Sequence, residues 1–334
     1  MRRLVLGLLL ALVLPATAGA ANRVSTFYYP WYGTTAEDGL FEHWSQDGHA
    51  PPGDIASAYY PALGVYSSSD RLVVGAQMDE IRSAGIDEVA VSWWGRGSPE
   101  DARMPLVVAA ARSRGLGIAA HLEPYAGRTV ADVAADVAYL DAAYGIRTFY
   151  VYRALDLPVA DWAQAHPELH AEPGVVVYAQ TPLVGAAAAA GFDGIYTYDI
   201  VTYGGNTFRR ICDEAHAKNL LCAPSVGPGY DARRGNGDPR VKPRRGGRTY
   251  DAMWRAAIGA AADRVTITSF NEWHEGTQIE PAVVRRRGRY RYLSYDGAWG
   301  LHGAAAETAY LARTRYWSDV FRRTSPVHPS TSAS

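Results

Sequence analysis

The sequence of 334 residues predicts a single (β/α)8 barrel, and three observations carry this prediction. Short apolar segments rich in β-branched and aromatic residues alternate with segments whose apolar residues recur at helical spacing. No shift in composition marks a domain boundary between residues 21 and 324, and α/β barrels reach this length as one domain. Polar and aromatic residues gather at the ends of several expected strands, which in a barrel surround one mouth. An open doubly wound sheet shows a similar alternation, and the third observation favours the barrel over it.

The first half of the chain contains three expected strands with their helices. Residues 24–29 form a β-branched and aromatic run that Pro30 ends. A long connection up to Asp70 follows, and its aromatic residues favour an ordered loop at a site over disorder. The helix expected at 71–84 stops at Gly85. The other elements of this half are strands at 88–94 and 116–122 and helices at 99–114 and 129–144.

The second half repeats the alternation with shorter elements. Residues 224–248 form a long connection rich in Gly, Arg and Pro after the seventh strand, and residues 325–334 have the composition of a frayed tail. The strands are expected at 148–152, 175–179, 194–198, 220–223 and 265–270, and the helices at 159–165, 183–190, 207–218, 250–262 and 303–321.

Residues 1–20 have the composition of a secretory signal peptide. Arg2 and Arg3 precede an apolar run that is too short to cross a bilayer, and Ala-Gly-Ala at 18–20 is a typical cleavage signal. We therefore expect a secreted or otherwise extracytoplasmic protein, with the catalytic domain at residues 21–324. No later stretch of the sequence is long and apolar enough for a membrane span.

The charge balance argues against a nucleic-acid partner. The chain has 33 basic and 34 acidic residues, for a net charge of −1, whereas a nucleic-acid-binding protein needs a basic face. Two Arg-rich stretches, 233–248 and 285–291, are most simply solvated loops, although they would also suit an anionic glycan. We expect a monomer that binds an oligosaccharide or polysaccharide.

The cysteines and histidines do not predict a metal or a cofactor. Cys212 and Cys222 are the only cysteines; in an exported protein they could pair, but the sequence does not give the distance between them. His43, His49 and His274 lack the spacing and the carboxylate partners of a metal site. No glycine-rich phosphate-binding motif is present in the sequence.

The stretch 267–281 carries the strongest indication of catalysis. A buried strand breaks there into a loop that contains Glu272 and Glu275 among Asn271, Trp273 and His274. Two carboxyl groups at a strand end suit acid/base work on a glycosidic bond, in which one protonates the leaving oxygen and the other acts at the sugar. The alternative, a charged surface turn, gives no reason for the interleaved Trp, Asn and His. Sequence spacing does not give the distance between the two carboxyl groups.

The strand ends together predict an aromatic mouth with a few carboxylates and amides, which suits a polyhydroxylated ligand. Only one of Trp93 and Trp94 can face it, because neighbouring side chains of a strand point to opposite sides. Glu123 either binds the ligand or pairs with Arg128, and His121 is expected as a hydrogen-bonded wall residue. The expected mouth comprises Tyr28, Tyr29, Trp31, Trp93, Trp94, His121, Glu123, Tyr125, Tyr196, Tyr198, Asn271, Glu272 and Glu275.

Six motifs in this sequence resemble glycoside hydrolase family 99, the endo-α-1,2-mannosidases and bacterial endo-α-1,2-mannanases. They come in the family's order and span nearly the whole chain after residue 20. They are FYYPWY at 27–32, SWW at 92–94, HLEPY at 121–125, FDGIYTY at 192–198, GPGY at 227–230 and NEWHEGTQIE at 271–280.

The resemblance implies a (β/α)8 barrel without a metal that hydrolyses α-mannosides internally and with retention. It implies that Glu272 deprotonates the 2-hydroxyl of the mannosyl residue, which attacks its own anomeric carbon to give a 1,2-anhydro sugar. Glu275 then matches the general acid/base. By the same resemblance, subsites are lined by Asn271, Glu123, Tyr198, Trp94 and the first-strand tyrosines, with the choices between Trp93 and Trp94 and between Tyr196 and Tyr198 open.

The chain departs from the family pattern in two loops that we expect to border the mouth. One is 152–156, after the fourth strand, and the other is the Arg- and Gly-rich connection after the seventh. The resemblance therefore predicts the class of activity better than it predicts the substrate. Two alternatives remain at this point: an endo-hydrolase of another α-glycan, and a glycan-binding barrel without catalysis.

Overall fold

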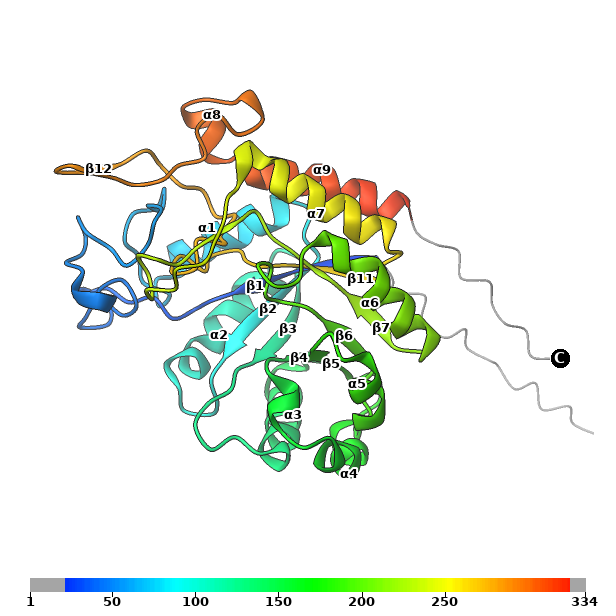
Figure 1. Ribbon diagram of the computed structural model, residues 1–334. Helices are drawn as coiled ribbons and strands as arrows, with labels where there is room; N and C mark the ends of the chain where they lie inside the picture. Colours follow the sequence, from blue (N-terminus) through cyan, green and yellow to red (C-terminus); the bar gives the residue numbers. More distant parts are fainter. Residues whose placement is uncertain (1–21, 325–334) are drawn as a thin grey trace, which may run out of the picture.

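The computed structural model describes residues 22–324 as a barrel of parallel strands surrounded by helices (Figure 1). The expected signal peptide at 1–20 and the expected tail at 325–334 lie outside the described residues. Each strand of the barrel pairs in parallel with its neighbours, in the order β7-β6-β5-β4-β3-β2-β1-β11-β8. The strands are β1 (Arg23–Tyr28), β2 (Glu88–Trp93), β3 (Gly117–Leu122), β4 (Thr148–Val151), β5 (Val176–Gln180), β6 (Gly194–Tyr196), β7 (Leu221–Ala223), β8 (Ser225–Val226) and β11 (Arg264–Ile267).

The seventh barrel strand is interrupted at Pro224. The segment before this residue, β7, pairs with β6, and the segment after it, β8, pairs with β11. Proline has no N–H to donate to a ladder, so the strand is split in two where it passes from one neighbour to the other. The two pieces together close the ring, and the predicted (β/α)8 barrel is confirmed.

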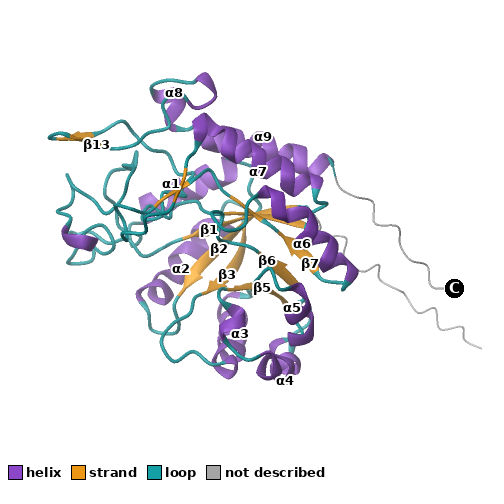
Figure 2. Cartoon of the chain, viewed as in Figure 1, coloured by secondary structure: helices purple, strands orange, loops and turns teal. Residues whose placement is uncertain are grey.

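The helices lie around the outside of the strands (Figure 2). Side-chain caps explain several of their starts: Asp70 accepts from the N–H of Leu72, and Thr129 and Asp132 form a capping box. No helix in the part of the chain that the structure describes has the length and apolar content needed to cross a membrane. The helices are α1 (Arg71–Ser83), α2 (Pro99–Arg112), α3 (Val130–Tyr144), α4 (Val159–Leu169), α5 (Val184–Ala190), α6 (Gly205–Ala217), α7 (Arg248–Gly259), α8 (Ala304–Glu307) and α9 (Ala309–Arg323).

The expected single helix at 303–321 is wrong in one respect, because the structure divides it into α8 and α9. Thr308 stands between them with φ −102° and ψ 7°, outside helical geometry. The alanine-rich pattern hid this break, since alanine favours a helix at every position. The longer helix, α9, packs against α7, where Tyr250 and Thr314 bond through their hydroxyl groups at 2.8 Å.

The long connection 29–70 is ordered, as predicted. Trp44 is fully buried in it and donates its indole N–H to the Tyr66 carbonyl at 2.8 Å. Bridges at Tyr59 and Pro61 attach this connection to the segment that follows the catalytic candidates. Two small hairpins complete the loop-rich side at the left of Figure 1: β9 (Tyr230–Asp231) with β10 (Val241–Lys242), and β12 (Arg286–Arg287) with β13 (Tyr290–Arg291).

The amino-terminal end of the barrel is closed by a buried ion pair. Glu88 of β2 pairs with Arg264 of β11, and Ser25 donates its hydroxyl to Glu88 at 2.8 Å. Arg264 also donates to the Tyr150 hydroxyl at 3.1 Å. With both charges paired and hydrogen-bonded, this end supports the fold and leaves the opposite end of the strands for a site.

Cys212 of α6 and Cys222 of β7 form a disulfide bond. Their Cα atoms are 5.2 Å apart and the two residues are 10 positions apart in the chain. The question that the sequence left open is therefore answered by the packing of α6 against the strand that follows it. A disulfide is typical of proteins that mature in an oxidising compartment.

We expect the double substitution Cys212→Ala and Cys222→Ala to lower the free energy of unfolding by about 2–3 kcal/mol, because the bond closes a short loop and restricts the unfolded chain. Denaturant titration of the oxidised wild type, the reduced wild type and the variant would measure this. The reduced wild type keeps both sulfur atoms, so a loss confined to the variant would show that packing, and not the cross-link, is responsible.

Candidate active site

The loop after β11 is folded back on itself at the carboxyl end of the barrel. Ser269 donates its main-chain N–H to the Thr277 carbonyl at 3.0 Å, and its carbonyl accepts from Ile279 at 3.0 Å. The Ser269 hydroxyl accepts the N–H of Glu272 at 2.8 Å. These bonds confine residues 270–277 to one compact excursion, and both Glu272 and Glu275 lie on it.

Asn271 ties this loop to the end of β1. Its side-chain oxygen accepts the N–H of Tyr29 at 2.7 Å, and its amide N–H donates to the Tyr29 carbonyl at 3.0 Å. The residue is fully buried and its amide is bound to the main chain of Tyr29, so a contact between Asn271 and a substrate stays a prediction. The side-chain amide takes the place of the main chain of a neighbouring strand, because it presents one donor and one acceptor side by side.

A third buried carboxyl group, that of Glu280, lies beneath the loop. It accepts hydrogen bonds from Trp273 Nε1 at 2.8 Å, from the Tyr66 hydroxyl at 2.9 Å and from Gln77 Nε2 at 2.8 Å. Burial raises its pKa to about 7. The sequence analysis assigned Glu280 no role. Its position at the end of the motif NEWHEGTQIE, which also contains Glu272 and Glu275, was a signal that could have identified it.

The cavity at the mouth brings the two candidate catalytic residues together with aromatic walls. Its volume is about 300 Å³. Among the predicted site residues, Tyr29, Trp31, Trp94, Glu123, Tyr198, Glu272 and Glu275 line it. Sequence reasoning did not name Pro124, Tyr152 and Arg153 as site residues, but they line it too. The expectation that the loop after the fourth strand borders the mouth is confirmed.

A smaller hollow of about 50 Å³ opens beside Glu275. Tyr230 and Arg240, from the connection after the seventh strand, line it together with Asp199 and Ile200. The second loop that departs from the family pattern therefore also borders the mouth, as predicted.

Two predicted mouth residues, Tyr28 and Trp93, lie on the helix side of the barrel. The Tyr28 hydroxyl donates to Gln77 of α1 at 2.6 Å, and Trp93 Nε1 donates to Asp101 of α2 at 2.9 Å. Side chains alternate along a strand, so Phe27 and Tyr29 point inward where Tyr28 points outward. The placement of Tyr28 at the mouth is wrong, and of the two tryptophans it is Trp94 that faces the cavity.

Three further predicted residues border the site without lining the cavity. His121 and Tyr196 are buried in the barrel interior, where His121 Nε2 lies 2.9 Å from the Tyr196 hydroxyl. Tyr125 is directed toward α3 and donates its hydroxyl to Asp136 at 2.6 Å. His121 is thus hydrogen-bonded as expected, but it and Tyr196 support the cavity from below, and the placement of Tyr125 in the mouth is wrong.

Glu123 faces the cavity and is not paired with Arg128. Its carboxylate accepts the Ser92 hydroxyl at 2.8 Å and lies 2.9 Å from His121 Nδ1. Arg128 instead donates to the main-chain carbonyls of Leu122, Glu123 and Tyr152 at 2.9–3.0 Å. The arginine therefore fixes the strand ends, and the carboxylate stays free for a ligand.

Burial controls the protonation of the catalytic pair. It raises the pKa of Glu275 to about 7, with Asp199 and Glu123 adding to the effect. Burial and then repulsion from Glu275 raise the pKa of Glu272 well above its ordinary value. The pair therefore retains protons near neutral pH, and a group that works as a general acid at that pH needs such a raised pKa.

The ionised form of Glu272 is supported by the main chain and not by Asn271. Its Oε1 accepts the N–H of His274 at 3.2 Å, whereas the amide of Asn271 is bound to Tyr29. His274 lies 3.6 Å from the carboxyl group, but burial lowers its pKa to about 4, so it is neutral at pH 7.

Tyr198 is held in the left-handed backbone region at the side of the cavity. Its φ is 48°, which a residue with a large side chain rarely adopts. Its N–H donates to the Ser225 hydroxyl at 2.8 Å, and its own hydroxyl is hydrogen-bonded to that of Tyr29. Strain of this kind is typical of functional sites, where the surroundings hold a side chain in place.

The three histidines considered above do not form one cluster, although His43 and His274 stack on each other. His43 stacks on Trp31 with ring centroids 4.4 Å apart and on His274 at 5.5 Å, while His49 faces Asp54. Within residues 22–324, no three His, Cys, Asp or Glu side chains are grouped as metal ligands.

A (β/α)8 barrel that holds two buried carboxyl groups in an aromatic cavity at the carboxyl ends of its strands defines a glycoside hydrolase. The sequence profile of glycosyl hydrolase family 99 matches residues 20–165 and 180–323. The chain belongs to glycosyl hydrolase family 99, and it is an enzyme.

Several relatives agree with this assignment. The chain is 33% identical to a glycoprotein endo-alpha-1,2-mannosidase-like protein of Danio rerio, over 90% of this chain and 78% of the relative. It is 31% identical to a glycoprotein endo-alpha-1,2-mannosidase of Mus musculus, over 93% and 79%. The GH99 endo-alpha-mannosidase structure from Bacteroides thetaiotaomicron superposes with a TM-score of 0.81 at 30% identity, covering 92% of this chain and 99% of that one.

We expect Glu280→Leu to lower the free energy of unfolding by about 3 kcal/mol, since it leaves the buried donors of Trp273, Tyr66 and Gln77 without an acceptor. It should also reduce kcat more than it changes KM, because Trp273 sits between the two catalytic candidates. Glu280→Gln, which keeps an acceptor oxygen, should show less than half of both effects. Equal losses in the two variants would mean that hydrogen bonding at this position does not hold the loop.

Proposed function

We propose that this protein is an exported endo-acting glycoside hydrolase that cleaves α-mannosidic linkages of α-1,2-mannan or high-mannose glycans with retention. The observation that carries the proposal is the presence of Glu272 and Glu275 in one aromatic cavity at the mouth of the barrel. Family membership and relatives named endo-α-1,2-mannosidases support the substrate class. The disulfide between Cys212 and Cys222 supports export.

The cavity suits a sugar ring in shape and in polarity. Trp31, Trp94 and Tyr152 offer flat faces for the C–H surfaces of a pyranose. The indole N–H of Trp94 is buried and has no hydrogen-bond partner among residues 22–324, so a substrate hydroxyl can accept from it. The Glu123 carboxylate complements this donor, because it can accept hydrogen bonds from substrate hydroxyl groups.

The proposed reaction proceeds in two steps through a 1,2-anhydro sugar. In the first, Glu272 takes the proton of the 2-hydroxyl, O2 bonds to the anomeric carbon, and the glycosidic C–O bond breaks as Glu275 protonates the leaving oxygen. In the second, Glu275 takes a proton from water, the water oxygen bonds to the anomeric carbon, and the C1–O2 bond breaks as O2 recovers its proton from Glu272. Two inversions at the anomeric carbon give net retention.

The electrostatics of the pair support these roles. The raised pKa of Glu275 keeps it protonated for the first step. The raised pKa of Glu272 makes its ionised form a stronger base toward a sugar hydroxyl than an ordinary carboxylate. A 2-hydroxyl that donates to Glu272 in the bound complex favours that ionised form.

Arg153 favours a second candidate, an endo-hydrolase of another α-glycan. This residue lines the cavity in the loop that departs from the family pattern, and its guanidinium pairs with Asp156 at 2.6 Å. A cation at this wall alters the contacts of one subsite without touching Glu272 or Glu275. A binding barrel without catalysis finds no such support, because binding alone needs neither buried acid.

The first test is a product analysis on α-1,2-branched mannan and on a glucosylated high-mannose glycan, by mass spectrometry and anomeric NMR. Wild-type protein should release mannose-containing fragments with α configuration. Glu272→Gln and Glu275→Gln should each lower kcat by about 10³-fold or more while oligosaccharide binding persists. Glu37→Gln, an exposed change of the same kind, is the control. Binding without release by the wild type would reject the mannosidase and point to another α-glycan.

The pH dependence of kcat/KM tests the role of Glu275 separately. Because its pKa is raised to about 7, the protonated acid is present below that pH and is lost above it, so kcat/KM should fall about tenfold per pH unit on the alkaline side. Asp199→Asn removes a negative charge that helps to raise this pKa and should move the alkaline limb to lower pH. An alkaline limb that Asp199→Asn leaves in place would argue against Glu275 as the acid.

A further inference from the structure

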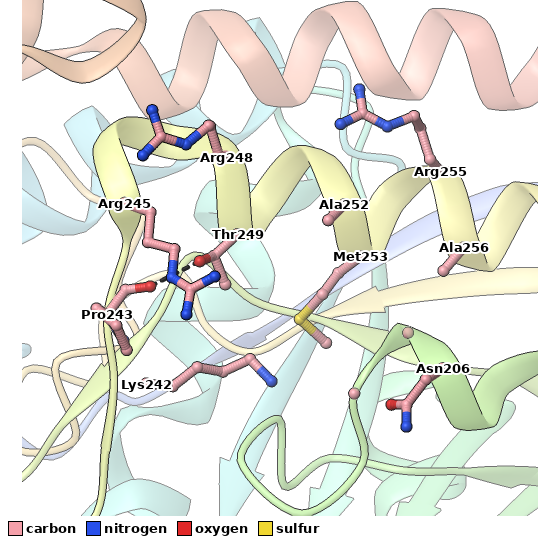
Figure 3. A pocket seen from close by; sticks show the side chains of 12 residues that line it. Asn206, Lys242, Pro243, Arg245, Arg248, Thr249, Ala252, Met253, Arg255 and Ala256 are labelled. Carbon is pink, nitrogen blue, oxygen red and sulfur yellow. Dashed lines mark hydrogen bonds between the residues drawn. The ribbon is translucent and has the colours of Figure 1, made fainter.

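A second hollow lies outside the mouth, where α6 and α7 begin (Figure 3). Its volume is about 810 Å³, larger than that of the catalytic cavity. Gly205 brings the two helices close together, since a Cβ atom there would lie 2.6 Å from the Cβ of Ala256. We call this hollow the basic groove, for the side chains that line it: Lys242, Arg245, Arg248 and Arg255.

The basic groove carries positive charge without a matching negative charge. No Asp or Glu is among its lining residues, and none of its four cations forms an ion pair within the described range 22–324. Figure 3 shows Lys242 and Arg245 on the side of α7 that faces Asn206, whereas Arg248 and Arg255 extend from its other side, where Arg255 lies over Trp317 of α9. Like charges gathered in a concave surface repel one another, and a bound anion relieves that repulsion.

Lys242 is held in a partly buried position at the wall of the groove. Its Nζ donates to the Ile200 carbonyl at 2.6 Å, which fixes its position. Burial lowers its pKa, the charge of Asp199 opposes this, and the charge of Arg245 adds a smaller lowering. Asp199 is itself bound by Arg240 and Thr202, so it does not neutralise the groove.

The ends of the two helices add to the positive potential. The residues preceding α6 and α7 are Gly204 and Gly247, which have no side chain to cap the first N–H groups. The amino end of a helix carries a partial positive charge. At the basic groove this partial charge adds to the charge of the four cationic side chains.

The basic groove adjoins the catalytic cavity through one loop. Asp199 and Ile200 line the hollow beside Glu275, and the same loop reaches the groove at Gly204. The bond from Lys242 to Ile200 joins the two sides. A polysaccharide extends beyond the linkage that is cleaved, so a chain that leaves the cavity beside Glu275 meets this loop next.

We propose that the basic groove binds a phosphate group carried by the glycan, and that the enzyme prefers mannan that bears phosphate. The inference rests on the proposed function and adds a substrate preference to it. Guanidinium and ammonium groups match the oxygens of a phosphate ester, and Arg does so with two parallel hydrogen bonds. The net charge of −1 argues against a broad basic face for a nucleic acid or a membrane.

The test compares kcat/KM on phosphorylated mannan with kcat/KM on the same mannan after removal of its phosphate. At low salt the wild type should prefer the phosphorylated polymer by about fivefold to tenfold, and 0.5 M salt should abolish the preference. Arg245→Gln with Arg248→Gln should remove the preference and leave activity on the neutral polymer unchanged. Both residues are exposed and lie outside the catalytic cavity.

The matched control is Arg286→Gln with Arg289→Gln, which removes the same charge from the exposed hairpin of β12 and β13. This variant should keep the preference. A wild type without preference, or a preference that both double variants lose equally, overturns the proposal. The second result would show an effect of net charge alone.

Direct binding separates this inference from the proposed function. Inorganic phosphate, titrated by calorimetry, should bind the wild type and the hairpin variant and bind the groove variant at least fivefold more weakly. Sulfate, titrated in parallel, distinguishes recognition of a tetrahedral oxyanion in general from a preference for phosphate. If neutral mannan is not cleaved but phosphate binds in this pattern, the proposed function fails and the anion site stands. If mannan is cleaved and phosphate does not bind, the proposed function stands and the anion site fails.

Discussion

The paired hydrogen bonds between the Asn271 amide and the main chain of Tyr29 hold the catalytic loop to the barrel. Glu272 follows Asn271 directly and Glu275 follows in the same short loop, so their positions depend on this attachment. Trp273 adds a second attachment through its indole N–H, which is bound by the buried Glu280. A short polar loop becomes rigid in this way, and rigidity is what allows two carboxyl groups to act on one bond.

The same burial that fixes the loop also sets its chemistry. The carboxyl groups of Glu272, Glu275 and Glu280 all have raised pKa values, because burial removes water from them. At the opposite end of the barrel, Arg264 neutralises the buried Glu88. No Lys or Arg forms an ion pair with Glu272 or Glu275 within the described part of the chain, so the two carboxyl groups retain protons near neutral pH.

The connection after the seventh strand carries positive charge, in contrast to the carboxyl groups of the cavity. The connection after the seventh strand supplies Arg240 to the hollow beside Glu275 and Lys242 and Arg245 to the basic groove. One loop thus borders both the acidic catalytic cavity and a basic exterior. In a barrel, loops can change in this way without altering the strands, so the charge around the mouth can change while the strands keep their arrangement.

The sequence by itself determined the ring of strands and the place of Glu272 and Glu275 at its mouth, because alternating periodicity and strand ends are local features. It also limited the choice to one of Trp93 and Trp94. Only the tertiary structure decided which one faces the cavity, that Tyr28 points to Gln77, and that Asn271 serves the backbone. These outcomes depend on contacts between segments up to 242 residues apart, such as Tyr29 with Asn271, which no local pattern encodes.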